Sequence, residues 1–172
     1  MELRPTGGFI GSFAIITFDG GRLTDMNVSD VYAADGQLKG HVEPPSPIKD
    51  YLGESNWYLR DSNWDPDFPT SAARAEWFLD KEVDKKVDGT IAVDLELAKS
   101  ILKVVGPISL QDFNEAIDYK NLYEKTQGEV ESNFFPGSYK KTNFLTALSR
   151  QLLSRISEAQ EHEYIPLAKT IF

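Results

Sequence analysis

The chain has 172 residues, of which 41% are hydrophobic, so it is long enough for one well-formed core and short enough to be a single α/β domain spanning residues 1–172. Its 18 basic and 27 acidic residues give a formal net charge of -9. This charge argues against a nucleic-acid partner, because such binding depends on neutralising phosphates. The chain has no cysteine, which excludes disulfides and thiolate metal sites, and its two histidines, His41 and His162, lack the spacing of a zinc site.

No apolar run in the sequence approaches the length of a membrane span, and the N-terminus lacks the basic and then apolar layout of a signal peptide. If the protein is exported or anchored, we expect the responsible segment to be absent from this chain. Contact with a membrane is therefore expected only through segments outside it.

The first predicted elements form a β-hairpin. Residues 11–18 are apolar and β-branched and are closed by the turn Asp19-Gly20-Gly21, after which residues 22–32 alternate as a half-buried strand should. Residues 36–47 contain three prolines and are expected to be irregular, because each proline moves its predecessor out of the helical region.

Residues 59–70 carry three aspartates, an arginine and a tryptophan in a segment that Pro66 and Pro69 should keep from forming a helix or a central strand. Ordered loops of this kind are often binding loops, which makes this segment the leading candidate site. The structural alternative is that its aspartates cap turns and the helix that follows. That helix is expected to begin at Ser71, with Thr70 or Ser71 as N-cap, because apolar residues recur from Ala75 to Val83 at helical spacing.

The second half of the chain alternates between strand and helix patterns. Residues 87–93 are predicted to form a strand, residues 95–105 a helix capped by Asp94 and ended by Gly106-Pro107, and residues 108–110 a further strand, giving a βαβ-like unit. Two further helices are expected over residues 118–127 and 142–160, with residues 134–138 as a loop. The pattern predicts an α/β fold in which helices flank a mixed β-sheet.

Several polar residues could bind an anion or a cation. Arg60 and Arg74 could form a clamp for phosphate or carboxylate, although ion pairs with nearby acids are the commoner fate of arginines. Four aspartates could converge on Mg²⁺ or Ca²⁺, but their spacing is not that of a calcium loop. They are Asp30, Asp35, Asp61 and Asp65.

Aromatic residues and one histidine add weaker candidates. Trp57, Tyr58 and Trp64 could stack on sugar rings, although aromatic residues beside a loop more often fill a core. His41 stands near Glu43 and could serve as a base, but it is isolated from other candidate catalytic residues.

Three motifs resemble the uncharacterised bacterial family catalogued as domain of unknown function 4012. They are ELRPTGGFIGS at residues 2–12, DVYAADG at residues 30–36 and NWYLRDSNW at residues 56–64. The resemblance implies an outward-facing, extracytoplasmic part of a larger bacterial cell-envelope protein. It also implies an apolar strand directly before residue 2, so we expect a sheet edge near Gly11 that is exposed or filled by another molecule, for example in an oligomer.

A more distant resemblance is to the LytR-CpsA-Psr family, through residues 87–95, residues 101–102, residues 106–108 and residues 144–148. It implies a sandwich of that type lacking its first strand. Proteins of that family move glycopolymers from a polyprenyl pyrophosphate lipid to the cell wall, using arginines and aspartates around bound Mg²⁺. On this analogy Arg4 matches an arginine ahead of the first catalytic strand, and Asp30 matches an aspartate that would be the metal ligand.

Two departures from the LytR-type pattern matter. Thr6-Gly7-Gly8 replaces an aspartate, and acidic residues such as Glu124 and Glu129 stand where a later arginine pair is expected. Acidic groups there would repel a pyrophosphate.

Two functions therefore stay open. The first is an envelope domain that grips a phosphorylated or lipid-linked glycan, with LytR-like phosphotransferase activity if it is an enzyme; the second is a non-catalytic structural, binding or scaffold module of the cell surface. For the first function the candidate catalytic residues are Arg4, Asp30, Arg60 and Asp61. The candidate ligand-binding residues are Arg74, Asp35, His41, Trp64 and Asp65.

Overall fold

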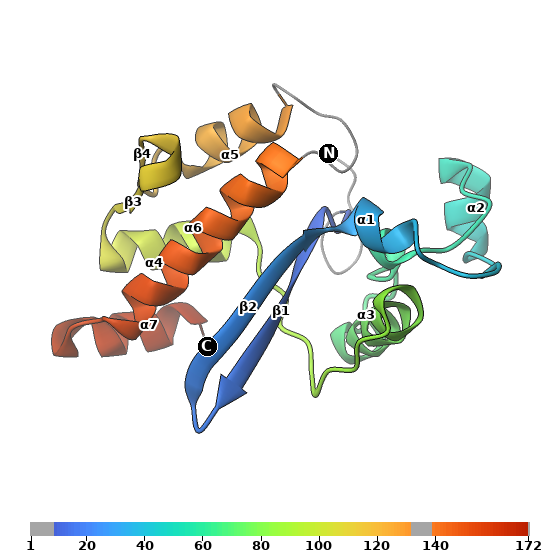
Figure 1. The fold of residues 1–172 in the computed structure, drawn as a ribbon, viewed down its shortest axis with the longest axis horizontal. Helices are drawn as coiled ribbons and strands as arrows, with labels where there is room; N and C mark the ends of the chain where they lie inside the picture. Colours follow the sequence, from blue (N-terminus) through green and yellow to red (C-terminus); the bar gives the residue numbers. More distant parts are fainter. Residues whose placement is uncertain (1–8, 132–138, 172) are drawn as a thin grey trace. The chain divides into compact units, whose positions relative to one another are not determined.

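The computed structural model describes residues 9–131 and 139–171. Figure 1 shows the order of the elements along the chain. The elements are β1 (Ser12–Asp19), β2 (Arg22–Asp30), α1 (Val31–Asp35), α2 (Ser46–Leu52), η1 (Leu59–Asp61), α3 (Phe68–Val83), α4 (Leu95–Val105), β3 (Ile108–Leu110), η2 (Gln111–Phe113), β4 (Glu115–Ile117), α5 (Leu122–Glu131), α6 (Tyr139–Ser157), η3 (Glu161–Glu163) and α7 (Tyr164–Ile171).

The chain divides into two compact units. Unit 1 comprises the described residues of Met1–Phe13 together with Ser29–Ile91, and unit 2 comprises Ala14–Val28 and Ala92–Phe172. The single domain expected over residues 1–172 stays a prediction.

The predicted N-terminal hairpin is confirmed. β1 and β2 pair as a two-stranded sheet joined at Gly20 and Gly21, whose φ angles of 55° and 79° are those of the two-residue turn that suits the twist of a hairpin (Figure 1). β2 ends at Asp30, earlier than residue 32, because the Asp30 side chain caps α1 and so converts the next residues to helix. Among the described strands β1 has only β2 as a neighbour. The expectation that another molecule, for example in an oligomer, fills the sheet edge near Gly11 stays a prediction.

The fold is a mixture of helices and strands, as predicted, but the prediction of one mixed sheet was wrong. The described strands form two separate two-stranded antiparallel sheets, β1 with β2 and β3 with β4. Residues 87–93 contain no strand, so β3 pairs with the following segment β4, with Ile108 opposite Ile117, and no βαβ unit forms. A sandwich of the LytR-CpsA-Psr type is not confirmed by the described residues.

In unit 1 the short helix α1, the 3-10 turn η1 and the long helix α3 pack against one another. Their buried apolar side chains include Val31 of α1, Leu59 of η1 and Phe78 of α3, and Val31 and Phe78 have no exposed surface. Two further buried residues, Ile48 of α2 and Leu79 of α3, belong to the same unit. This small core fixes the end of α1, η1 and the C-terminal half of α3, which carry the polar residues Asp35, Arg60 and Glu82.

Helix α3 begins earlier than expected. Asp67 is its N-cap and accepts a hydrogen bond from the Thr70 amide, and Pro69 lies in the first turn, where its missing N–H costs nothing. The expectation that residues 59–70 contain no helix was therefore wrong at both ends, since η1 occupies Leu59–Asp61. The helix ends at Val83, after which Asp84 adopts a left-handed conformation with φ 54°.

Unit 2 contains a larger apolar core. Helix α4 runs over the predicted residues, with the Asp94 carboxylate accepting from the Leu97 amide at 2.8 Å, and Gly106 follows its last turn. Helix α6 begins at Tyr139, three residues before the predicted start, and its buried side chains are Phe144, Leu148 and Leu152. The buried members of the core are Ala98, Ile101, Leu102, Val105, Ile108, Leu110, Ile117, Leu122, Phe144, Leu148, Leu152 and Leu167.

Three elements of unit 2 differ from the expectation. Helix α5 begins at Leu122 because Asp118 accepts hydrogen bonds from the amides of Lys120 and Asn121, which makes a turn ahead of the helix. Helix α7 was not predicted, and the expected loop at residues 134–138 lies outside the described residues. No helix in the described part of the chain is both long enough and apolar enough to cross a membrane.

Candidate functional site

Arg60 is the centre of a polar network in unit 1. Its Nη1 donates to Asp35 Oδ2 at 2.8 Å and its Nη2 donates to Glu54 Oε2 at 2.8 Å. Its Nε lies 3.4 Å from Asp61 Oδ2. We call these four residues, Arg60, Asp35, Glu54 and Asp61, the Arg60 network. All three guanidinium nitrogens of Arg60 thus face carboxylates of the same unit.

The Arg60 network is largely enclosed. The side chain of Arg60 is 13% exposed, and those of Asp35 and Asp61 are 4% and 2% exposed. The guanidinium carbon lies 4.3 Å from the ring centroid of Tyr58, so an aromatic face covers one side of the charge. Burial raises the pKa of Asp35, against the opposing effect of the hydrogen bond from Arg60. Buried polar groups that are bonded to partners within the protein are usually structural. For Arg60 the structure therefore favours ion pairs with nearby acids over a clamp for an anion.

Glu82 of α3 supports the network from the neighbouring helix. Its Oε1 accepts a hydrogen bond from the Leu59 amide at 3.1 Å, which ties α3 to the start of η1. The residue is 3% exposed, and burial raises the pKa of its carboxyl group from 4.5 to about 7, with the nearby charge of Asp35 acting in the same direction. Glu82 therefore titrates near neutral pH, unlike an ordinary surface glutamate.

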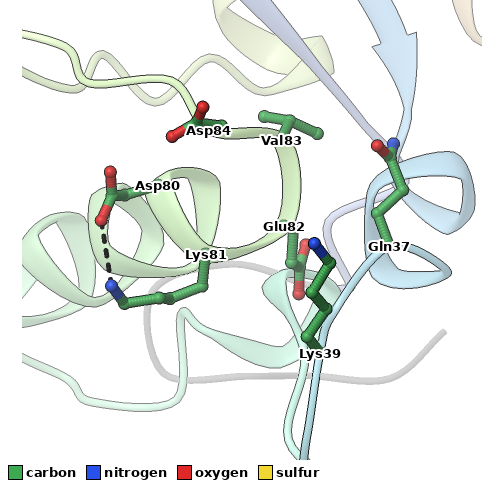
Figure 2. Close-up of a pocket in the computed structure, with 7 residues that line it drawn as sticks. All are labelled: Gln37, Lys39, Asp80, Lys81, Glu82, Val83 and Asp84. Carbon is green, nitrogen blue, oxygen red and sulfur yellow. Dashed lines mark hydrogen bonds and ion pairs between the residues drawn. The ribbon is translucent and has the colours of Figure 1, made fainter.

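The C-terminal end of α3 borders a pocket with a volume of about 630 Å³ (Figure 2). Its lining mixes both charge signs, and Lys81 Nζ lies 3.3 Å from Asp80 Oδ2. Figure 2 shows that the lining comes from the last turn of α3 and from the segment after α1. The lining residues are Gln37, Lys39, Asp80, Lys81, Glu82, Val83 and Asp84. None of the site residues predicted from the sequence is among them.

Asp30 serves as the N-cap of α1. Its Oδ1 accepts a hydrogen bond from the Tyr32 amide at 2.9 Å, and the residue is 5% exposed. This is the ordinary role of an aspartate at the start of a helix. Across residues 9–131 and 139–171, no group of three or more histidine, aspartate or glutamate side chains is placed to hold a metal ion. A role for Asp30 and Mg²⁺ stays a prediction.

Two other predicted residues, His41 and Asp65, have local partners. His41 Nε2 lies 2.9 Å from Glu43 Oε2, and this exposed carboxylate also binds Lys49. Asp65 Oδ1 accepts from the Asp67 amide at 2.8 Å, which is the turn chemistry named as the structural alternative. Trp64 is partly buried.

Arg74 lies on an aromatic surface of unit 1. Its guanidinium carbon is 4.8 Å from the ring centroid of Trp57 and 5.7 Å from that of Trp77. Arg60 and Arg74 thus have different partners, because Arg60 contacts carboxylates and Tyr58 whereas Arg74 contacts two indoles. The structure brings Asp35, Arg60 and Asp61 together, and it gives Arg74 a separate aromatic setting. Arg4 lies outside the described residues.

Two acids of this region were missed in the sequence. Glu54 follows the glycine that ends α2, and nothing in its local pattern distinguishes it from a surface residue. The burial of Glu82 could have been predicted from the sequence, because Glu82 lies four residues after Phe78 and three after Leu79. This spacing places it on the apolar stripe of α3. We assigned that stripe to Val83, but the structure buries Glu82 instead.

A family model described as "Protein of unknown function (DUF4012)" matches residues 1–130. The chain therefore belongs to that family. No curated protein and no solved structure matches it.

Proposed function

We propose that this chain is a non-catalytic binding or structural module of the bacterial cell envelope. The observation that carries the proposal is the enclosure of Arg60 by Asp35, Glu54 and Asp61. An arginine that stabilises a transferring pyrophosphate must direct its N–H groups at the substrate. In this chain those N–H groups bind carboxylates of the same unit. A pyrophosphate would have to displace these carboxylates from Arg60, which would leave buried charges unpaired and is therefore unfavourable.

The use of Asp30 as a helix cap supports the same proposal. A magnesium ligand needs a carboxylate oxygen directed at the ion, usually together with other oxygen ligands. The Asp30 side chain instead accepts from the Tyr32 amide. The extracytoplasmic location is supported by the resemblance of the three family motifs to envelope proteins. A phosphorylated or lipid-linked glycan remains the proposed partner of the module.

The experiment is calorimetry with a short-chain polyprenyl pyrophosphate, with and without Mg²⁺. We expect the wild-type chain to show no binding that depends on Mg²⁺. The informative variant is Asp30→Asn, because asparagine caps a helix about as well as aspartate but carries no charge for a metal. Asp94→Asn is its matched control, since Asp94 caps α4 in unit 2 in the same way. Saturable Mg²⁺-dependent binding that is lost in Asp30→Asn and kept in Asp94→Asn would overturn the non-catalytic proposal.

The location is tested separately. Cells that produce the chain naturally are fractionated, and the chain is detected with an antibody in the envelope and cytoplasmic fractions. We expect it in the envelope fraction. Recovery from the cytoplasm alone would refute the envelope part of the proposal and leave the calorimetric result unaffected.

A further inference from the structure

We propose that Arg74, Trp57 and Trp77 form a binding site for a saccharide that carries a carboxylate or phosphate group. We call these three residues the Arg74 surface. The inference rests on the proposed function in that it names the ligand class of a non-catalytic module, and it uses residues outside the Arg60 network.

The Arg74 surface is held in place by packing beneath it. Trp57 and Trp77 both contact the buried ring of Phe78, with centroid separations of 5.5 Å and 5.0 Å. The Trp57 ring is oriented further by the hydrogen bond from its Nε1 to the Asp61 carbonyl at 3.0 Å. Arg74 and Trp77 lie three residues apart on α3 and therefore share one face of that helix. The two indoles are thus fixed before any ligand arrives, which lowers the entropic cost of binding.

The guanidinium of Arg74 has the opposite surroundings to that of Arg60. Arg74 is exposed, and in the part of the chain that the structure describes its contacts are the two indole faces, with no carboxylate within ion-pair distance. Stacking covers the flat faces of a guanidinium and leaves the N–H groups at its edge able to donate. Five donors in a fixed plane suit two parallel hydrogen bonds to a carboxylate or phosphate.

The indoles supply the second half of the recognition. Trp77 is 37% exposed, although it packs on a fully buried ring, so part of its side chain is open to solvent. A sugar ring presents an apolar C–H face and a rim of hydroxyl groups, and an exposed indole offers a rigid flat surface for the apolar face. Neighbouring cationic and aromatic groups therefore match a ligand that combines a sugar face with a negative charge. A neutral sugar would leave Arg74 unused, and an inorganic anion would leave the indoles unused.

The test is a nuclear magnetic resonance titration that follows the indole N–H signals of Trp57, Trp77 and Trp64. Trp64 is the internal reference, because it is the third tryptophan of the chain and is outside the Arg74 surface. The probes are a hyaluronan hexasaccharide for carboxylate, glucose 1-phosphate for phosphate, cellohexaose as the neutral sugar and inorganic phosphate as the bare anion. We expect saturable shifts of Trp57 and Trp77 with one or both charged sugars and little shift of Trp64.

Variants of the full chain complete the test. Arg74→Ala should weaken binding of the charged sugar by about 10-fold or more, because a charge-assisted pair of hydrogen bonds is lost. Arg74→Lys should recover only part of this, since lysine lacks the planar fork. Arg22→Ala, at an exposed arginine of β2 in unit 2, is the matched control and should bind as wild type does.

The outcomes separate the two proposals. Absence of shifts with both charged sugars, or unchanged binding in Arg74→Ala, would overturn the Arg74 site and leave the non-catalytic module standing. Equal binding of inorganic phosphate or cellohexaose would also overturn it, because the combined chemistry would then be unnecessary. Mg²⁺-dependent pyrophosphate binding through Asp30 would overturn the proposed function instead, and the titration would still decide the Arg74 site.

Discussion

Replacement of Arg60 by alanine tests whether the Arg60 network holds unit 1 together. The substitution removes one guanidinium and leaves Asp35 and Asp61 buried without their counter-charge. Removing one partner of a buried ion pair costs about 3–5 kcal/mol of unfolding free energy. Glu54 is 35% exposed and can turn to water, which favours the lower end, and loss of the stack on Tyr58 adds about 0.5–1 kcal/mol. We therefore expect Arg60→Ala to lower the unfolding free energy of unit 1 by about 3 kcal/mol.

The assay is urea unfolding followed by tryptophan fluorescence. All three tryptophans of the chain, Trp57, Trp64 and Trp77, lie in unit 1, so their fluorescence reports that unit. Arg74→Ala is the matched control, because it removes an exposed arginine from the same unit and should cost no more than about 1 kcal/mol. A loss in Arg60→Ala no larger than in Arg74→Ala would refute the structural role of the network. The loss should also shrink at acidic pH, because burial raises the pKa of Asp35 and that carboxylate takes up a proton there.

Two further substitutions test other parts of the structure. Burial raises the pKa of Glu82 from 4.5 to about 7. Between these pH values the folded chain keeps a proton on Glu82 that the unfolded chain releases. This contribution to the unfolding free energy is complete below pH 4.5 and is lost as the pH rises through 7. Urea unfolding at pH 5 and pH 8 should therefore give a difference on the order of 2 kcal/mol that Glu82→Gln reduces, and an unchanged difference would count against the buried carboxylate. Asp94→Ala should cost unit 2 about 1 kcal/mol by removing the cap of α4, measured by circular dichroism, whereas Asp94→Asn should leave stability nearly unchanged.

The elements that could be predicted from the sequence are those specified by local chemistry. The turn at Gly20 and Gly21 needs positive φ at both positions, which glycine adopts without strain. Helix α4 has its cap at Asp94, its apolar stripe and its terminal glycine within one short segment. The strand predicted at residues 87–93 failed because a strand is stable only with a neighbour to pair with. That neighbour is a tertiary property, and Ile108–Leu110 pairs with Glu115–Ile117 instead.

The residue types of the candidate site could be predicted from the sequence, but the role of these residues could not. The segment around Arg60 does hold a dense group of charges, as the residue types indicated, yet the partner that encloses Arg60 from α1 is Asp35, 25 residues away in sequence. Glu54 and Glu82 come from two further segments. Whether an arginine binds a ligand or an internal carboxylate depends on such distant partners. Local spacing, which is all that a single sequence offers, does not reveal them.

The two arginines of unit 1 show how neighbours decide the use of the same side chain. Arg60 lies among acids, and its burial is tolerated because three carboxylates and an aromatic ring replace water around it. Arg74 lies on two indoles that cover its faces without neutralising its charge. A charge that is already paired inside the fold gains little from an added anion. An exposed, stacked guanidinium can bind an anion with only a small desolvation free energy. For this reason we assign stability to Arg60 and ligand recognition to Arg74, and the pair Arg60→Ala and Arg74→Ala should separate the two effects in a single set of unfolding and binding measurements.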